Sequence, residues 1–388
     1  MAVQSKGKIK LAIFSFSILM MGVIAIAGGM GAIGARFSTE NVAMLIALPS
    51  IPIIIVTLLI GKITEYISMK KLVIIGILCY LVGGVIPAFM DSFFSILVMR
   101  CVFGVGVGIV QALSAALVGA NFEGDERAKV MGQMTSAQMI GAAFTLFIGG
   151  LLASIGWNIT FYVHLVAVIS LVCVIAFLPD VKPQRQTAAA GPSEKPALTK
   201  GALGWAFATL LFFVGGMILA QFMAGFLGSR EYGGPVESGT ATMIFAIGGF
   251  LMGLVYGKLA QGTKNFVFAV GLFVCTISYL LVAFAPNLFM SFVGALVYGF
   301  GITVIMATVM GGTASSVMPW SIPLAISITT CGQNVGSYLC PLVAMAVAGI
   351  MGPDIYQNAF MFGAILFGVM GVAAVIWAIA KKPKPAAA

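Results

Sequence analysis

Charged residues are scarce in this sequence. They make up 8% of its 388 positions, whereas hydrophobic residues make up 61%. A soluble globular domain carries roughly 25% charged residues, which cover its surface. A soluble chain with this composition could neither bury so much apolar surface nor present enough charge to water. The composition therefore excludes an ordinary soluble fold and predicts an integral membrane protein.

The sequence also lacks the residue groups that metal, redox and nucleotide chemistry require. Its six cysteines lie in apolar stretches without CxxC spacing, and His164 is the single histidine. There is no HExxH motif, no acid pair within an apolar stretch and no phosphate-binding glycine loop. We therefore expect no enzyme activity, no catalytic or metal-binding residue, no cofactor and no direct drive by ATP.

The net charge of +9 is spread along the chain. Of the 20 Lys and Arg residues, all but Arg36, Arg100 and Arg230 fall on one side of the bilayer in the topology given below. Basic residues favour the cytoplasmic loops of membrane proteins, whereas a nucleic-acid site groups them on one face with aromatic partners. The pattern excludes nucleic acid as a partner. It predicts a multi-pass protein of the cell membrane with both termini in the cytoplasm.

Long apolar runs divide the chain into candidate membrane-spanning helices. Each span needs about 20 largely apolar residues. Twelve runs meet this requirement, and they lie near residues 9–35, 41–61, 71–90, 93–119, 129–153, 158–179, 201–228, 237–257, 265–285, 288–314, 319–347 and 355–380. The expected fold class is all-α, with twelve transmembrane helices embedded in the lipid bilayer.

Residues 180–200 interrupt this pattern, because they are polar and rich in Pro and Ala, as in a flexible linker. Six predicted spans lie on each side, and short motifs recur about 195 residues apart, as parallel structural repeats would show. The matches are Gly61-Lys62-Ile63 with Gly257-Lys258-Leu259, Phe103–Gly106 with Tyr298–Gly301, and Gln138–Gly141 with Gln333–Gly336. We therefore predict two pseudo-symmetric six-helix bundles, 1–179 and 201–388, joined by a cytoplasmic linker, 180–200.

The loop between the second and third predicted helices carries a family signature. Gly61 is followed four residues later by the acid Glu65, and then by Lys70 and Lys71. This pattern resembles the corresponding loop of the major facilitator superfamily, although Glu replaces the usual Asp. With twelve helices and a central linker, the resemblance covers essentially the whole chain. It implies a secondary transporter in which a monomer would suffice.

The resemblance also implies that this loop is part of a gate on the cytoplasmic side. Arg127 and Lys129, after the fourth helix, are the natural basic partners for Glu65. The gate residues we expect are Gly61, Glu65, Lys70, Lys71 and Arg127. The alternative is that Lys70 and Lys71 only anchor the topology.

Arg100 lies about seven residues into the fourth predicted helix, about 10 Å from its start. A charge at this depth faces a cavity or a partner, or else its side chain extends back to the interface. The run from Arg100 to Gly106 resembles the fourth-helix signature of proton-coupled members of the family, and Gln111 lies on nearly the same face. None of the 11 acids lies clearly inside a span. A cavity lined by Arg100 would therefore be electropositive and suit an anion.

Other polar side chains lie within apolar spans. Thr330, Asn334 and Tyr338 form a stripe at i, i+4 and i+8 on the eleventh helix. Such a stripe either binds a substrate or holds helices together by hydrogen bonds worth about 0.6–2 kcal/mol each. The candidate substrate-binding or coupling residues are Arg100, Gln111, Gln138, Gln221, Thr330, Gln333, Asn334 and Tyr338.

The resemblance favours secondary active transport of a small organic solute by alternating access, and Arg100 directs the expectation toward an organic anion. The alternative is a proton-coupled multidrug efflux antiporter, because Gly156-Trp157-Asn158 resembles a loop of drug-efflux-like members. Against it, Thr145-Leu146 stands where the exporters have a Gly-Pro pair. The expected partners are a small-molecule substrate and lipid, with protons or a counter-substrate for coupling.

Overall fold

The computed structural model describes residues 6–38, 41–122, 124–180, 198–318 and 321–380. It is 89% helical, and these ranges contain no strand. In a bilayer every backbone amide and carbonyl must be satisfied within the protein, which is why apolar runs of this length become helices. The predicted all-α class is confirmed.

Residues before 180, the first half of the chain, form six helical spans, several of them built from consecutive segments. These segments are α1 (Lys6–Ser17), η1 (Ile18–Ile24), η2 (Ala27–Gly29) and α2 (Met30–Phe37); η3 (Asn41–Ala43), α3 (Met44–Ala47) and α4 (Ser50–Ile63); α5 (Met69–Val85) and η4 (Ile86–Phe89); α6 (Phe93–Asn121); α7 (Gly124–Ile155); and η5 (Ile159–Leu165) and α8 (Val166–Phe177). The first and second spans are thus interrupted, a feature that hydropathy does not reveal.

Residues after 199, the second half of the chain, form six more spans. They are α9 (Lys200–Gly216) with α10 (Ile218–Ser229); α11 (Pro235–Thr263); η6 (Lys264–Phe266) with α12 (Val267–Ala283); α13 (Leu288–Ser315); α14 (Ile322–Met351); and α15 (Ile355–Ala380). By length and composition, 10 helical stretches of the described chain can cross a membrane, and one of them, Pro235–Ala283, contains both α11 and α12. The shorter apolar part of α7, Gly141–Ile155, accounts for the remaining predicted span.

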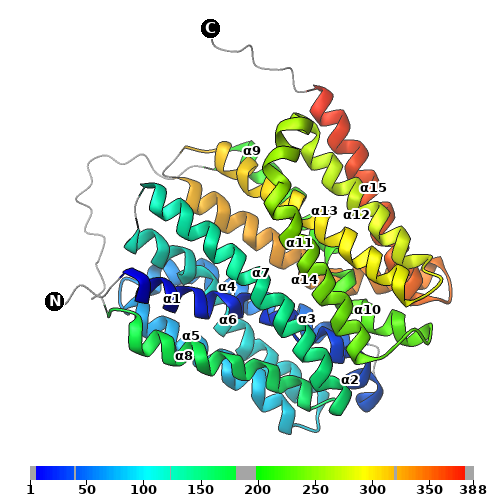
Figure 1. The fold of residues 1–388 in the computed structure, drawn as a ribbon, viewed down its shortest axis with the longest axis horizontal. Helices are drawn as coiled ribbons and strands as arrows, with labels where there is room; N and C mark the ends of the chain where they lie inside the picture. The colour runs from blue at the N-terminus through cyan, green and yellow to red at the C-terminus, as the bar shows by residue number, and fades with distance from the viewer. Residues whose placement is uncertain (1–5, 39–40, 123, 181–197, 319–320, 381–388) are drawn as a thin grey trace.

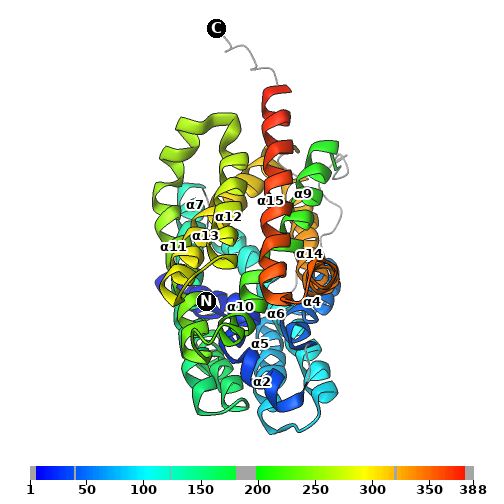
Figure 2. The same cartoon turned by 90° about the vertical axis from the view of Figure 1, so that its right-hand side faces the viewer.

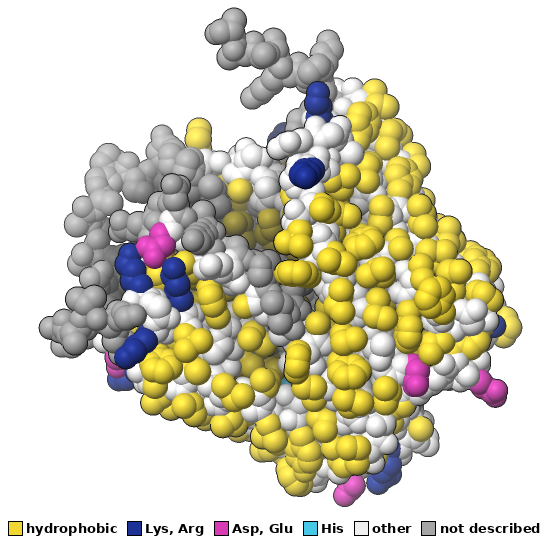
Figure 3. Space-filling model, in the orientation of Figure 1, with side chains coloured by type: hydrophobic (Ala, Val, Ile, Leu, Met, Phe, Trp, Pro, Cys, Tyr) yellow, Lys and Arg dark blue, Asp and Glu magenta, His cyan; other side chains and the backbone are white. Residues whose placement is uncertain are grey.

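The surface of the molecule is apolar where a bilayer would contact it. Large side chains such as Phe94 (74% exposed) and Ile350 (87% exposed) project outward from the helices. In Figure 3, hydrophobic side chains cover the middle of the visible face, and charged side chains gather toward its edges. This distribution suits a solvent of lipid in the middle and water at both ends.

The two halves of the chain lie against each other along a few helices (Figures 1 and 2). The fifth span, α7, packs along α11, and α4 of the second span packs along α14. One large buried cluster includes side chains from both halves. The predicted linker lies almost entirely in 181–197, outside the described residues, so the division into two bundles stays a prediction.

At one end of the molecule the halves are in direct backbone contact. We call this the far end; it contains the end of α7 at Ile155 and the start of α11 at Pro235. A Cβ on Gly150 would lie 2.7 Å from the Pro235 carbonyl oxygen and 2.8 Å from Gly239 Cα. A Cβ on Gly28 would lie 2.7 Å from Gly150 Cα. Only glycine allows this approach, so the far end is closed.

The opposite end, the near end, is not closed in this way. Gly249, Gly253 and Gly257 form a small-residue ladder on α11, which is typical of close helix packing. Yet a Cβ on Gly253 or Gly257, or on Gly61 of α4, would meet no heavy atom of the described chain within 4 Å. The faces of Gly61, Gly253 and Gly257 are therefore unpacked at the near end, whereas Gly249 is buried against α13.

Candidate functional site

Arg100 is fully buried on α6, and it is the only charged side chain among the described residues that is buried. Its Nε donates a hydrogen bond to the Leu45 carbonyl oxygen (2.7 Å), and its Nη2 donates to the Val23 carbonyl oxygen (3.0 Å). The guanidinium carbon lies 4.2 Å from the centre of the Phe103 ring. The side chain therefore points into the protein and does not extend to the membrane interface. No acid is among these contacts.

The carbonyl groups that Arg100 contacts lie where helices are interrupted. Pro49 has no N–H, so the Leu45 carbonyl, four residues earlier, has no helical donor. Val23 lies in η1, where the first span follows a 3₁₀ rather than an α-helical path. A proline four residues after a buried carbonyl is the sequence signal that could have predicted this partner for Arg100.

His164 packs beside this cluster. Its ring lies 4.9 Å from Phe103 and 5.5 Å from Tyr80, measured between ring centroids. Its Nδ1 is 2.9 Å from the Phe161 carbonyl oxygen, and its Nε2 is 3.3 Å from the Gly22 carbonyl oxygen. The fourth and sixth spans thus each bring a nitrogen-bearing side chain to the irregular turn of the first span.

The predicted polar residues of the first half are not assembled around Arg100. Gln111 is half-buried, and its side chain makes no hydrogen bond to a described residue. Gln138 is buried on α7, and its Nε2 lies 3.2 Å from the Met20 sulfur. Arg100 and Gln138 therefore contact the first span at Val23 and Met20, three residues or about one turn apart.

A cavity of about 170 Å³ lies between the two halves. Its walls come from α2 and η3 in the first half and from α10, α14 and α15 in the second. Gln221 of α10 lines it, is 3% exposed, and donates a long hydrogen bond to the Ser337 carbonyl oxygen (3.5 Å). The Gln221 amide oxygen is buried without a hydrogen-bond partner among the described residues. An unsatisfied acceptor in such a place is costly unless a ligand or water meets it.

The polar stripe on α14 bonds to its own helix. The Thr330 hydroxyl donates to the Ile326 carbonyl oxygen (3.0 Å), and the Asn334 amide donates to the Thr330 carbonyl oxygen (2.9 Å). Gln333 and Tyr338 are half-buried, and their side chains make no hydrogen bond to a described residue. These contacts do not link helices, so the stripe retains polar groups for a ligand. Ser337, between Asn334 and Tyr338, brings the stripe next to Gln221.

The predicted gate residues lie at the near end, on and after α4. Glu65 is exposed and forms no ion pair with another described side chain. Lys70 donates to the Ile175 carbonyl oxygen (2.8 Å) near the end of α8, whereas Lys71 is exposed. The side chain of Arg127 lies outside the described part of the chain. The proposed pairing of Glu65 therefore stays a prediction.

A different acid makes ion pairs at the near end. Glu126, at the start of α7, lies 2.7 Å from Lys6 Nζ and 3.4 Å from Lys10 Nζ, both on α1. The hydrogen bond from Lys6, with a further one from Lys10, holds the pKa of the Glu126 carboxyl below its usual 4.5. The sequence did not identify this pairing, because nothing in it shows which loops meet.

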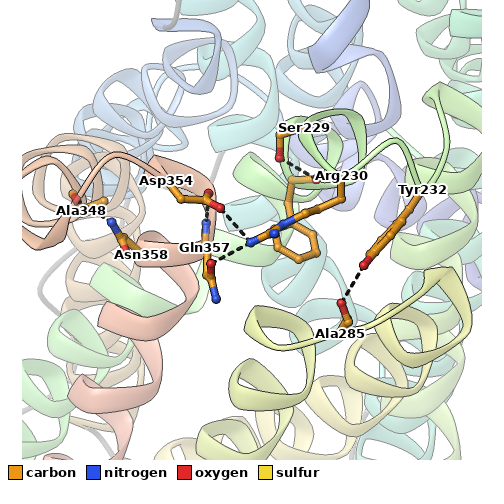
Figure 4. Close-up of polar contacts among 9 residues, drawn as sticks. Ser229, Arg230, Tyr232, Ala285, Ala348, Asp354, Gln357 and Asn358 are labelled. Carbon is orange, nitrogen blue, oxygen red and sulfur yellow. Dashed lines mark hydrogen bonds and ion pairs between the residues drawn. The ribbon is translucent and has the colours of Figure 1, made fainter.

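A second polar cluster lies at the far end (Figure 4). Arg230, after α10, donates to Asp354 and to the Gln357 amide oxygen, each at 2.7 Å. A cavity of about 310 Å³ lies beside this cluster, and it shares Ile355 and Tyr356 with the cavity lined by Gln221. Arg230 therefore fastens the end of α10 to the start of α15, a role that sequence reasoning missed.

Known proteins resemble the chain over most of its length. An uncharacterized MFS-type transporter of Bacillus subtilis (strain 168), YceJ, is 23% identical over 313 residues, which cover 79% of this chain and 77% of that protein. The hexuronate transporter of the same organism is 31% identical over 205 residues, 46% of this chain and 47% of the relative. The crystal structure of a point mutant of the nucleoside transporter NupG superposes with a TM-score of 0.78 at 14% identity, covering 95% of this chain and 99% of that one.

The model of the Major Facilitator Superfamily matches residues 11–259 and 205–388, which together include both halves of the chain. The twelve helical spans assigned to the described residues agree with that family's fold, and the relatives are membrane transporters. The chain therefore belongs to the Major Facilitator Superfamily and is a multi-pass membrane transporter.

Proposed function

We propose that the chain is a secondary active transporter that moves a small organic anion by alternating access. The observation that carries the anion preference is Arg100, a buried positive charge with no acid among its contacts. Arg100 does not line the cavity between the halves. Charge acts over a longer range in a low-dielectric interior than in water, so Arg100 still favours a negative solute there. A carboxylate is also what the name of the hexuronate transporter implies for that relative.

The solute would bind between the halves, where Gln221 and the stripe on α14 supply hydrogen-bonding groups. The described arrangement, closed at the far end and unpacked at the near end, is then one of the two states of the cycle. In this proposal the bundles 1–179 and 201–388 rock about the bound solute. The near end, which carries Lys6, Lys10, Lys70 and Lys71, faces the cytoplasm according to the basic-residue rule.

Uptake by the purified protein in liposomes tests this function. We expect labelled glucuronate to enter faster when the liposomes are preloaded with unlabelled glucuronate, and glucose of similar size to enter much more slowly. Arg100→Gln should reduce glucuronate uptake at least about tenfold, the effect of a 1.4 kcal/mol loss of binding. Arg100→Lys, which retains the charge, should keep a measurable part of it.

Arg36→Gln is the matched control, because Arg36 is half-exposed and pairs with exposed Asp91 (3.5 Å). It should transport like the wild type. Uptake of glucuronate and glucose at equal rates, or full glucuronate uptake by Arg100→Gln, would contradict the anion proposal.

The rival function is proton-coupled efflux of amphiphilic drugs. It is favoured by the run from Arg100 to Gly106 and by Gly156-Trp157-Asn158, as described above. Against it, no acid among the described residues is buried, although a buried carboxylate is a common means of binding and releasing protons. Dye extrusion driven by an imposed pH gradient in the same liposomes, without glucuronate exchange, would favour the rival.

A further inference from the structure

The seventh span is interrupted between Gly216, where α9 ends, and Ile218, where α10 begins. Tyr279 of α12 places its hydroxyl at this break. The hydroxyl donates to the Gly215 carbonyl oxygen (2.9 Å) and accepts from the Leu219 amide (3.4 Å). In a continuous helix, the Leu219 amide would donate directly to the Gly215 carbonyl. The tyrosine hydroxyl therefore takes the place of one helical hydrogen bond and bridges its two ends.

A second tyrosine hydroxyl acts on the next carbonyl. Tyr298 of α13 donates to the Gly216 carbonyl oxygen. The rings of Tyr279 and Tyr298 are fully buried, with centroids 5.0 Å apart, and Phe360 and Phe367 pack against Tyr279. Bulk water does not reach such a core, so a backbone carbonyl freed by the break must find a protein donor. The two tyrosine hydroxyls are these donors. A side chain that inserts between a helix N–H and the carbonyl four residues earlier is a recognised cause of helix bends.

The first half of the chain has a comparable arrangement at its own first span. That span leaves the α-helical path in η1, and a Cβ on Gly22 would overlap the Tyr80 hydroxyl. Tyr80 belongs to the third span of its half, as Tyr279 does of the other, and its ring lies 4.6 Å from Phe103. The internal repeat equates Phe103 with Tyr298. Both halves therefore set an aromatic pair from their third and fourth spans against the irregular part of their first span.

The segments beyond these two breaks form facing walls of one cavity. In the second half α10 contributes Gln221 and Phe222, and in the first half α2 contributes Gly31 and Gly34. The two segments are also in contact with each other. A change of bend at Gly215–Gly216 would therefore move α10 relative to α2 and alter the cavity and its closure at the far end.

We propose that Tyr279 and Tyr298 are positioning residues that hold the seventh span bent and thereby keep α10 closed against α2. A straight seventh span, in which Leu219 bonds directly to Gly215, is the alternative state. Without the hydroxyls, the bent form leaves the buried Gly216 carbonyl without its tyrosine donor and the Gly215 carbonyl with the Met217 amide alone. The straight form supplies the Gly215 carbonyl with the well-placed Leu219 amide instead. Because α10 already touches α2 in the bent form, straightening moves them apart. The role of this movement in transport rests on the proposed function, but the movement itself does not.

Spin labels on either side of the cavity measure this movement without any substrate. Ala35→Cys on α2 and Gly228→Cys on α10 supply exposed label sites, in a full-length background whose six free cysteines are replaced. The probe is the distribution of distances between the labels in lipid nanodiscs. Tyr279→Phe should raise the ratio of the long-distance to the short-distance population at least about fivefold, the effect of one ordinary hydrogen bond. Tyr298→Phe should shift it in the same direction.

Tyr256→Phe is the matched control. Its hydroxyl lies 3.2 Å from the Thr308 hydroxyl, away from the break, so the same atom is removed and one hydrogen bond is lost. Its distance distribution should equal that of the parent. Distributions unchanged in Tyr279→Phe, Tyr298→Phe and the double variant would overturn the proposal. If the Tyr279 variant does not give folded protein, Tyr298→Phe alone decides.

A proline at position 219 tests the mechanism of the shift. Leu219→Pro removes the amide that would complete the straight helix. It should therefore restore the short-distance population in the Tyr279→Phe background. Suppose that the Tyr279→Phe/Leu219→Pro variant shows a normal thermal melting curve and still keeps the long-distance population. That result would overturn the assignment of the straight form to the hydrogen bond between the Leu219 amide and the Gly215 carbonyl. The label distances are measured without substrate, so they do not depend on glucuronate uptake. Absence of uptake would contradict the proposed function alone, and unchanged distances would contradict the tyrosine proposal alone.

Discussion

Arg100 Nε lies 2.7 Å from the carbonyl oxygen of Leu45, the one that Pro49 leaves without a helical donor. A charged side chain deep in a membrane protein is costly, and here it is compensated by backbone groups that are themselves costly to leave unpaired. The same guanidinium also reaches the first span at Val23. Arg100 therefore joins three spans, whatever its charge does for a solute.

Arg100→Lys should destabilise the protein although it keeps the charge. The Leu45 and Val23 carbonyls are reached by two different guanidinium nitrogens, and a single ammonium cannot occupy both positions. We expect a loss of about 1–3 kcal/mol in the free energy of unfolding, the cost of one buried unsatisfied acceptor. Thermal unfolding in detergent measures it, and a melting temperature equal to that of the wild type would contradict the two-carbonyl role.

Pro49→Ala should make Arg100 less important for stability. The new amide at position 49 can donate to the Leu45 carbonyl, which then no longer depends on the guanidinium. In a double-mutant cycle with Arg100→Met, we expect a coupling of about 0.5–3 kcal/mol, as for residues that share a partner.

Pro52→Ala is the matched control for this cycle. The carbonyl that Pro52 leaves free is that of Leu48, and it already accepts from the Ile51 amide (3.1 Å). Pro52→Ala and Arg100→Met should therefore be additive. Equal coupling in both cycles would show that the effect is general to the second span and not specific to Leu45.

Gly150→Ala should disturb the closed far end. Its Cβ would lie 2.7 Å from the Pro235 carbonyl oxygen and 2.8 Å from Gly239 Cα, closer than real Cβ contacts come. Both of these atoms belong to the backbone, so neither can move aside as a side chain would. We expect α7 and α11 to separate there and a cysteine in place of Ser238, which is buried on α11 beside Gly239, to react faster with a thiol reagent. Gly253→Ala, on the unpacked part of α11, is the matched control and should leave that rate unchanged. No difference between the two variants would mean that the far-end contact does not hold the halves together.

Glu126→Gln should lower stability at neutral pH but not in acid. The lysine partners hold the folded-state pKa of Glu126 below its usual 4.5, so the carboxylate stabilises the folded state above that pH, and the contribution is lost as the pH falls through the folded value. The pair is exposed, so the difference should be small. Melting temperatures of the two proteins should converge below pH 4.5, and a gap that persists there would exclude the ion pairs as its cause.

The twelve spans were predictable because a bilayer enforces them. An apolar run of about 20 residues has few ways other than a helix to satisfy its backbone. The run 201–228 was predicted as one span, and α9 with α10 covers 200–229. Its break was not predicted, because Gly215 and Gly216 are equally compatible with an unbroken helix, and the hydroxyls that hold it open come from residues 279 and 298.

The candidate site was predictable only residue by residue. Polarity within an apolar run singled out Arg100, Gln221 and Asn334, since burying such groups needs a reason. Where each one lies depended on packing between distant segments. Gln221 reaches a cavity between the halves, whereas Gln138, an equivalent candidate in the sequence, lies against the Met20 sulfur.

The sequence by itself determined the lipid environment, the number of spans and the family. Hydropathy and loop motifs are properties of short segments, so they can be read without knowing how the segments pack. Only the tertiary structure decided which groups satisfy the buried polar atoms. The Leu45 carbonyl accepts from Arg100, the Gly215 carbonyl accepts from Tyr279, and Glu126 pairs with Lys6. Each of these contacts joins residues more than 50 positions apart, and such pairings arise only once the helices have packed.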